Sequence, residues 1–99
     1  MTDSDMKKVW LHYDIGLAHF CANYKLDSGR NNAIKCCAIG KKNNNIVWEL
    51  LGNMLKSKLD FKMENYLGAR SSVRDALDLA RLFGDEDVIL FVDEVCPRE

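Results

Sequence analysis

Apolar and polar residues alternate along three runs in the first half of the chain. Residues 9–15, 18–26 and 33–39 place apolar side chains at about every second position, the pattern of a half-buried strand. The second run also has apolar residues at helical spacing, so a helix face is an alternative interpretation there. Turn-forming residues over 27–32 separate the last two runs and favour a hairpin. We therefore expect three consecutive strands.

A helix is the clearest element that the pattern predicts. Asn45 is suited to cap it, and apolar residues then recur three or four positions apart as far as Leu59, while Glu49, Asn53 and other polar residues point elsewhere. A short alternating run over residues 59–66 follows and predicts a fourth strand. Glu64 lies near the carboxyl end of that strand.

The last part of the chain predicts a second helix and a fifth strand. The helix begins at a capping box opened by Ser72 and ends at Gly84. The continuous apolar run over residues 88–92 is typical of a strand buried on both faces of a parallel sheet. The expected fold is therefore α/β, with a mixed five-stranded sheet in the order β-β-β-α-β-α-β.

Composition limits the class of protein. The chain has 99 residues, 47% hydrophobic and 29% charged, with one proline, which describes a single folded domain spanning residues 1–99. No apolar run approaches the roughly 20 residues that span a bilayer. The start MTDSDMKK has no apolar stretch typical of a secretory signal. We therefore expect a cytoplasmic protein that does not enter a membrane.

Charge is distributed unevenly along the chain. Residues 1–58 carry nine basic and five acidic side chains, a net of +4, and residues 59–99 carry five and ten, a net of −5. The total of −1 gives no general argument for nucleic-acid binding, which normally leaves a basic excess. The lysines of the first part could still form a local basic face.

The cysteines show no metal-binding spacing. The four are Cys21, Cys36, Cys37 and Cys96. They contain no C-x-x-C pair, and neither His12 nor His19 completes a zinc spacing. Reduced structural thiols are the favoured interpretation. The alternative is a cysteine nucleophile, Cys21 or Cys36, activated by one of the two histidines.

Two acidic residues follow predicted strands. Asp14 ends the first strand and Glu64 ends the fourth, and the carboxyl ends of neighbouring parallel strands meet at one edge of a sheet. Two carboxylates there would suit Mg²⁺ or Mn²⁺. Taken singly, a turn position explains Asp14 and a solvent-facing strand position explains Glu64.

Several of these runs resemble one protein family. Residues 9–16, VWLHYDIG, look like the first strand of RNase H-like nucleases of the RuvC type, the Holliday-junction resolvases. Residues 61–70, the following helix to Gly84 and the run 88–92 are similar to that family's fourth strand, second helix and fifth strand. The resemblance covers residues 8–93. It implies an RNase H-like fold and a metal-dependent nuclease that acts on branched DNA.

The resemblance also implies roles for individual residues. Asp14 and Glu64 match the positions that bind the catalytic metal ions in that family, here Mg²⁺ or Mn²⁺. The family places two further acids on a later helix, which the residues up to Glu99 do not include. Asp93 could supply the third catalytic carboxylate, although it does not match the motif. Lysines that could hold the DNA backbone are Lys41, Lys42 and Lys62.

Two further functions remain open from the sequence. A degenerate relative of the resolvases would bind DNA without cutting it. A small non-catalytic interaction protein, such as a phage-type inhibitor or a toxin-immunity protein, would bind a protein partner by surface complementarity. Either the acidic residues 85–87 with Asp93 and Glu94, or the basic loop over residues 40–45, would then meet an opposite charge. A homodimer is compatible with each of these functions.

Overall fold

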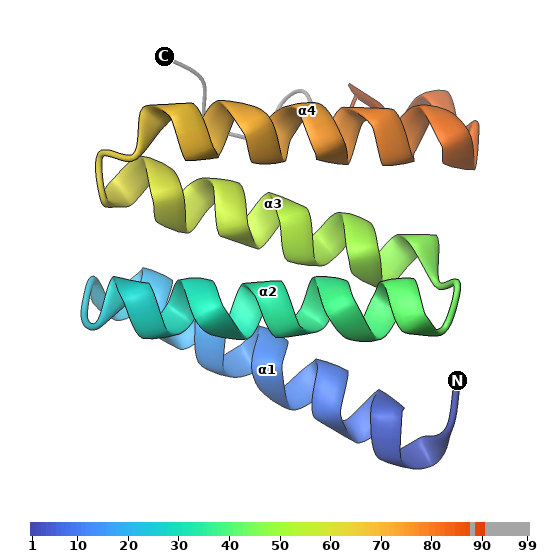
Figure 1. The fold of residues 1–99 in the computed structure, drawn as a ribbon, viewed down its shortest axis with the longest axis horizontal. Coiled ribbons are helices and arrows are strands. Elements are labelled where there is room, and N and C mark those ends of the chain that lie inside the picture. The colour runs from blue at the N-terminus through green and yellow to red at the C-terminus, as the bar shows by residue number, and fades with distance from the viewer. Residues whose placement is uncertain (88, 91–99) are drawn as a thin grey trace.

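The computed structural model describes residues 1–87, 89 and 90, and four long helices make up most of this part of the chain. In chain order they are α1 (Asp3–Ala22), α2 (Leu26–Lys42), α3 (Ile46–Lys62) and α4 (Tyr66–Phe83). Three-residue connections join them, so consecutive helices run antiparallel and side by side (Figure 1). The described residues contain no strand. The expected α/β fold with its RNase H-like five-stranded sheet is therefore wrong.

The last three helices begin 20 residues apart, and the connections before α3 and α4 have the same design. Asn45 and Asn65 occupy the N-cap positions, and each side-chain oxygen accepts the backbone N–H three residues further on. The residue before each cap, Asn44 or Glu64, has a positive φ of 53° or 62° that turns the chain. The expected strand over residues 59–66 is thus the end of one helix, a turn and the start of the next.

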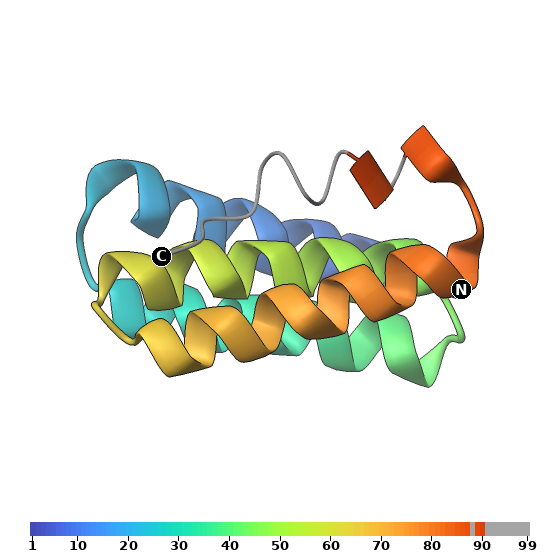
Figure 2. The same ribbon diagram turned by 90° about the horizontal axis from the view of Figure 1, so that it is seen from above.

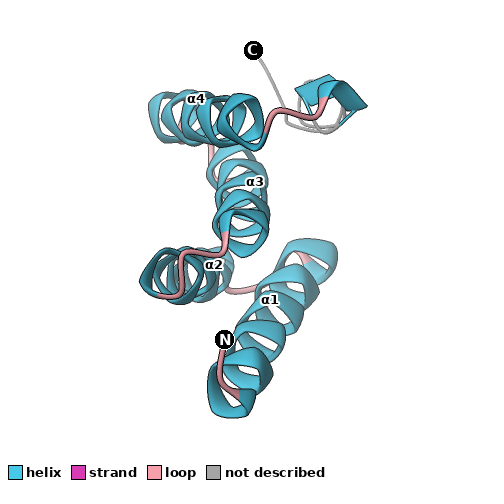
Figure 3. Cartoon of the chain, turned by 90° about the vertical axis from the view of Figure 1, so that its right-hand side faces the viewer, coloured by secondary structure: helices cyan, strands magenta, loops and turns pink. Residues whose placement is uncertain are grey.

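The helices pack as a flat array with α3 at its centre. Helices α2 and α4 pack against α3, and α1 packs mainly on α2 while also touching α3 (Figure 3). The array measures 33 × 30 × 18 Å. Beyond α4 the chain turns at Gly84 (Figure 2), and Ile89 packs against the apolar core between α3 and α4.

The core consists of three apolar clusters, and α3 contributes to all of them. The α3–α4 cluster comprises Leu50, Met54, Val73, Ala76 and Ala80. The two clusters toward α1 and α2 comprise Val9, Cys36 and Trp48, and Ala33, Leu55 and Leu59. Because α3 is covered by its neighbours on several sides, it carries more buried residues than the other helices.

The first predicted strand is wrong because its alternation coincides with a helical pattern. Val9, Tyr13 and Gly16 recur at intervals of four and three, and Val9 and Gly16 are buried. Leu11, which the strand pattern placed with Val9, is 57% exposed on the outer face of α1. The alternative helical interpretation of residues 18–26 is right as far as Ala22.

Residues that suggested turns lie inside helices because they allow close packing. A Cβ atom on Gly16 of α1 would lie 2.9 Å from Leu55 Cδ2 and 3.1 Å from the carbonyl oxygen of Gly29. Gly29 belongs to the run 27–32, which we expected to form a hairpin turn and which instead starts α2. The third predicted strand, residues 33–39, is the middle of the same helix. Glycine at this crossing brings α1 against α2.

Parts of the two predicted helices are confirmed. Asn45 caps α3, which continues past the predicted end to Lys62. Gly84, with φ 83°, ends α4. The start predicted at Ser72 is wrong, since Ser72 is fully buried in the middle of α4. Of the predicted strand 88–92, residues 89 and 90 are helical and the others lie outside the described residues.

Candidate binding groove

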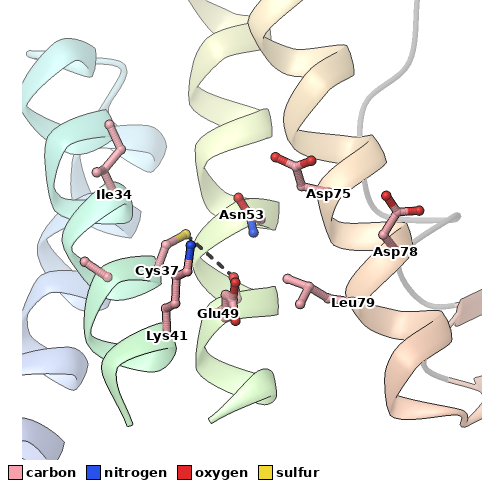
Figure 4. A pocket seen from close by; sticks show the side chains of 9 residues that line it. Ile34, Cys37, Lys41, Glu49, Asn53, Asp75, Asp78 and Leu79 are labelled. Carbon is pink, nitrogen blue, oxygen red and sulfur yellow. Dashed lines mark hydrogen bonds between the residues drawn. The ribbon is translucent and has the colours of Figure 1, made fainter. Parts of the chain in front are cut away.

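A groove of about 480 Å³ runs over α3 between α2 and α4 (Figure 4). Its walls come from the flanking helices and its floor from α3. The lining residues are Ile34, Cys37, Ala38 and Lys41 from α2, Glu49 and Asn53 from α3, and Asp75, Asp78 and Leu79 from α4. Its volume lies within the range of roughly 300–1,000 Å³ that is usual for ligand sites.

The walls combine apolar contact with negative charge. Ile34 on α2 is 38% exposed, and Leu79 lies further along the groove on α4, where it also packs against the core. Three carboxylates and one lysine line the groove, so its formal charge is −2. Asp75 and Asp78 are exposed on the α4 wall, and Asp78 lies 3.4 Å from Arg81 in an exposed ion pair. Such a surface suits a ligand with apolar and positively charged groups.

The floor is a stripe of polar residues on an otherwise apolar helix. Glu49, Asn53, Lys56 and Asp60 recur at intervals of four, three and four, which places them along one face of α3. The Asn53 amide lies between the two walls (Figure 4) and makes no hydrogen bond with another side chain or backbone group of the described residues. A polar floor can stay hydrated when no ligand is bound.

A cluster of charged and polar side chains closes the far end of this stripe; we call it the Asp60 cluster. Asp60 is fully buried and accepts a 2.6 Å hydrogen bond from Arg30 Nε. Lys56 Nζ lies 3.6 Å from the other carboxylate oxygen and donates to Ser72 Oγ at 2.8 Å. Asn65 Nδ2 also donates to Asp60. The Asp60 cluster therefore links α2, α3 and α4.

The cysteines of α2 are structural thiols. Cys36 Sγ donates to the carbonyl oxygen of Val9 at 3.4 Å, and Cys37 Sγ donates to that of Glu49 at 3.6 Å. Burial raises the pKa of each thiol to about 12. A thiol with such a pKa is protonated near neutral pH, so neither has the activated thiolate that a nucleophile requires.

The two histidines have partners other than cysteine. His12 Nδ1 donates to Asn32 Oδ1 at 2.9 Å, and His19 Nδ1 donates to the carbonyl oxygen of Tyr24 at 2.8 Å. These bonds tie α1 to α2 and to the connection between them. The described residues therefore give no support to a cysteine–histidine pair, and the structural interpretation is the better one.

The acidic residues singled out in the sequence lie on different elements. Asp14 is exposed on α1, Glu64 is exposed in the connection between α3 and α4, and Asp93 lies outside the described residues. No group of three or more metal-binding side chains occurs among the residues that the structure describes. Binding of Mg²⁺ or Mn²⁺ by Asp14 and Glu64 stays a prediction from the resemblance alone.

The lysines expected to hold DNA do not form one surface. Lys41 lines the groove, Lys42 lies 3.6 Å from Asp5, and Lys62 donates to the carbonyl oxygen of Phe20 at the other end of the array. Together with the absence of a sheet in the described residues, this corrects our description of an RNase H-like, DNA-binding nuclease. The structure likewise offers no support for a phage origin.

Sequence reasoning missed the groove although one signal for it was present. The polar stripe at Glu49, Asn53 and Lys56 was assigned to the side of the helix away from the core. On an isolated helix that side faces solvent. Here α2 and α4 flank it and turn it into a floor, which only the arrangement of all three helices reveals.

Comparison with known proteins gives no relative. No family model, no curated protein and no solved structure matches the chain. Within the described residues, no helix is both long and apolar enough to cross a membrane. The groove is therefore the feature of the molecule that points to a function.

Proposed function

We propose that this chain is a non-catalytic interaction module whose groove between α2 and α4 binds a segment of a partner protein. The observation that carries the proposal is an open groove with apolar side chains on both walls above a polar floor. Exposed apolar side chains gathered in a concave surface favour binding, because a ligand removes them from water.

The way the array is stabilised supports the same function. The Asp60 cluster and the α3–α4 core hold both walls of the groove to the helix that forms its floor. A preformed groove loses little conformational entropy when a partner segment binds. Function by surface complementarity was the second hypothesis from the sequence, and the groove supports it with a candidate surface other than the charged segments considered there.

Selection from a display library of random peptides tests this proposal. Peptides enriched on the parent protein are measured against Ile34→Asp, which places a charge on the apolar α2 wall, and against Leu11→Asp on the outer face of α1. Both variants are first checked for native helix content by circular dichroism. Leu11 is the matched control, because it is 57% exposed on an element that does not line the groove.

The proposal predicts ligands that bind the parent and Leu11→Asp equally and lose at least tenfold in affinity for Ile34→Asp. Burying an unpaired charge in an apolar contact accounts for that loss. Enriched peptides that bind Ile34→Asp as tightly as the parent would overturn the proposal, as would selection that enriches nothing.

A further inference from the structure

The charges of the groove indicate what kind of segment it takes. We infer, on the basis of the function proposed above, that the groove binds an extended, basic segment of a partner protein. Glu49 on the floor and Asp75 on the α4 wall are not in any ion pair with another described residue. Lysine or arginine side chains of a ligand would supply the missing charge.

The two walls of the groove differ in character. Ile34 and Ala38 give the α2 wall an apolar stretch, whereas Asp75 and Asp78 make the facing α4 wall acidic, with Leu79 further along it. In an extended chain, successive side chains point in opposite directions. Such a chain places alternate side chains toward opposite walls, so one segment can satisfy both the apolar and the acidic residues.

Asn53 favours an extended ligand over a helical one. Its amide offers both a donor and an acceptor at the centre of the floor and has no partner among the described residues. The backbone groups of a helix interior are already bonded to each other, whereas those of an extended chain are free. The Asn53 amide can therefore bond the main chain of an extended segment and hold it along the groove.

A defined peptide provides the first test. We would measure fluorescence anisotropy with an eight-residue labelled peptide in which lysine and valine alternate, because valine favours extended conformations. We expect it to bind, and the matching glutamate–valine peptide to bind at least tenfold more weakly. Added salt weakens binding, since the acids of the walls are exposed. Equal binding of both peptides, or no binding of the lysine–valine peptide, would overturn the inference.

Variants of the protein localise the effect of charge. Asp75→Lys replaces attraction by repulsion at the groove and is expected to weaken binding of the lysine–valine peptide about tenfold. Asp14→Lys makes the same change in net charge on exposed α1 and is the matched control, with binding expected within about twofold of the parent. An equal loss in both variants would mean that only net charge matters, and the groove assignment would fail.

A methylated peptide tests the role of Asn53. We expect Asn53→Leu to weaken the lysine–valine peptide about fivefold, the effect of one lost hydrogen bond. A version with methylated backbone nitrogens over its central residues should bind the parent weakly and lose nothing further with Asn53→Leu. If the methylated peptide binds the parent as well as the unmethylated one, the extended-chain inference is wrong.

Failure of this inference can be told apart from failure of the proposed function. Library ligands that depend on Ile34 but are neutral, acidic or helical would overturn the inference and leave the interaction module intact. Ligands that ignore Ile34 overturn both. Self-association of the parent in sedimentation, abolished by Ile34→Asp, would show that a second copy occupies the groove and would also overturn the basic-segment inference.

Discussion

Helix α3 has two sides that differ in what covers them. Toward α1 and α2, its residues Trp48, Leu55 and Leu59 are apolar and nearly or fully buried. On the side between α2 and α4, the polar stripe that begins with Glu49 and Asn53 forms the floor of an open groove. We call the first the closed side.

The difference shows how the chemistry of a surface decides whether another helix covers it. Apolar residues gain free energy when α1 removes them from water, by about 25 cal/mol for each Å². A stripe of amide and charged groups loses its hydration when covered and recovers it only through new hydrogen bonds. Where such bonds form, at the Asp60 cluster, the stripe is buried. Elsewhere along the stripe the groove stays open.

The largest expected contrast concerns the adjacent cysteines, since Cys36 faces the closed side and Cys37 lines the groove. Because their pKa values are about 12 instead of the ordinary 9, the thiolate fraction at pH 8 is lowered about a thousandfold. We would measure iodoacetamide labelling of a variant with Cys21→Ser and Cys96→Ser, in native buffer and in urea. Both sites should be strongly protected in the native protein.

The labelling rates of Cys36 and Cys37, compared with each other, distinguish the closed side of α3 from the groove. Cys37 is expected to react faster than fully buried Cys36, and a peptide bound in the groove should slow Cys37 alone. The same pKa values predict how the free energy of unfolding depends on pH. The contribution of the two thiols is fully present below pH 9 and is lost as the pH rises toward 12, because over that range the thiols ionise in the unfolded state but not in the folded one. Equal labelling of both cysteines would show that the closed side is not closed.

The second largest effect is expected at Asp60. Asp60→Asn removes the charge that compensates Arg30 and Lys56. Breaking a wholly buried ion pair costs about 3–5 kcal/mol of unfolding free energy, and since Arg30 is 32% exposed we expect the lower end, about 3 kcal/mol. Chemical unfolding in urea, followed by circular dichroism, measures it. The control Asp14→Asn changes an exposed acid and should shift stability by no more than about 0.5 kcal/mol. A stable Asp60→Asn would mean that the Asp60 cluster holds nothing together.

Leu59 precedes Asp60 and tests the closed side directly. Leu59 is fully buried, so Leu59→Ala leaves a cavity and is expected to cost about 2–4 kcal/mol in the same urea assay. Ile34→Ala shortens a side chain of the open groove that is 38% exposed, and should cost less than about 1 kcal/mol. Equal losses at the two positions would remove the distinction between the sides.

A smaller effect is expected at the contact between α2 and α3. A Cβ atom on Gly52 would lie 2.5 Å from Cys37 Sγ and 3.0 Å from the carbonyl oxygen of Ala33. Gly52→Ala must therefore push α2 away from α3, at a cost of about 1–3 kcal/mol that exceeds the gain in helix propensity. Because Cys37 also lines the groove, this variant should label faster at Cys37. Unchanged stability together with unchanged labelling would contradict the close packing.

How far the sequence predicted this molecule can be judged element by element. Around α3 the prediction succeeded, because the apolar spacing and the cap at Asn45 indicate a helix without help from the rest of the fold. In α1 it failed, because apolar residues also lie beyond the buried face: Leu11 is 57% exposed, and Trp10 is 52% exposed although its ring meets that of Trp48. With apolar residues all round, the period of the buried face is hidden.

The groove was beyond reach for a different reason. Local spacing placed Glu49 and Asn53 on one face of a helix, but the walls that turn this face into a floor lie about 10–30 residues away along the chain. Asp75 had no distinguishing sequence signal of its own. Asp14 and Glu64 drew attention because strands were expected to end there, and that expectation disappeared with the sheet.

The smallest expected effect contrasts a partly buried acid, Asp5, with fully buried Asp60. Asp5 on α1 accepts a 3.2 Å hydrogen bond from Asn43 Nδ2 and lies 3.6 Å from Lys42 Nζ, so it connects α1 to the end of α2. The bond from Asn43 lowers the pKa of Asp5 below its ordinary 3.8, and Lys42 adds to this effect. The stabilisation is therefore complete above pH 3.8 and is lost as the pH falls below it.

We would compare urea midpoints of the parent and Asp5→Asn at pH 7, 4 and 3. The difference between the two proteins should be small at pH 7 and should shrink as the pH falls from 4 to 3, because other acids titrate equally in both. At pH 7, Asp60→Asn should lower the free energy of unfolding more than Asp5→Asn does. In a pair shielded from water, loss of one charge leaves the other without compensation. If Asp5→Asn proved as destabilising as Asp60→Asn, burial would not be the property that separates the two carboxylates.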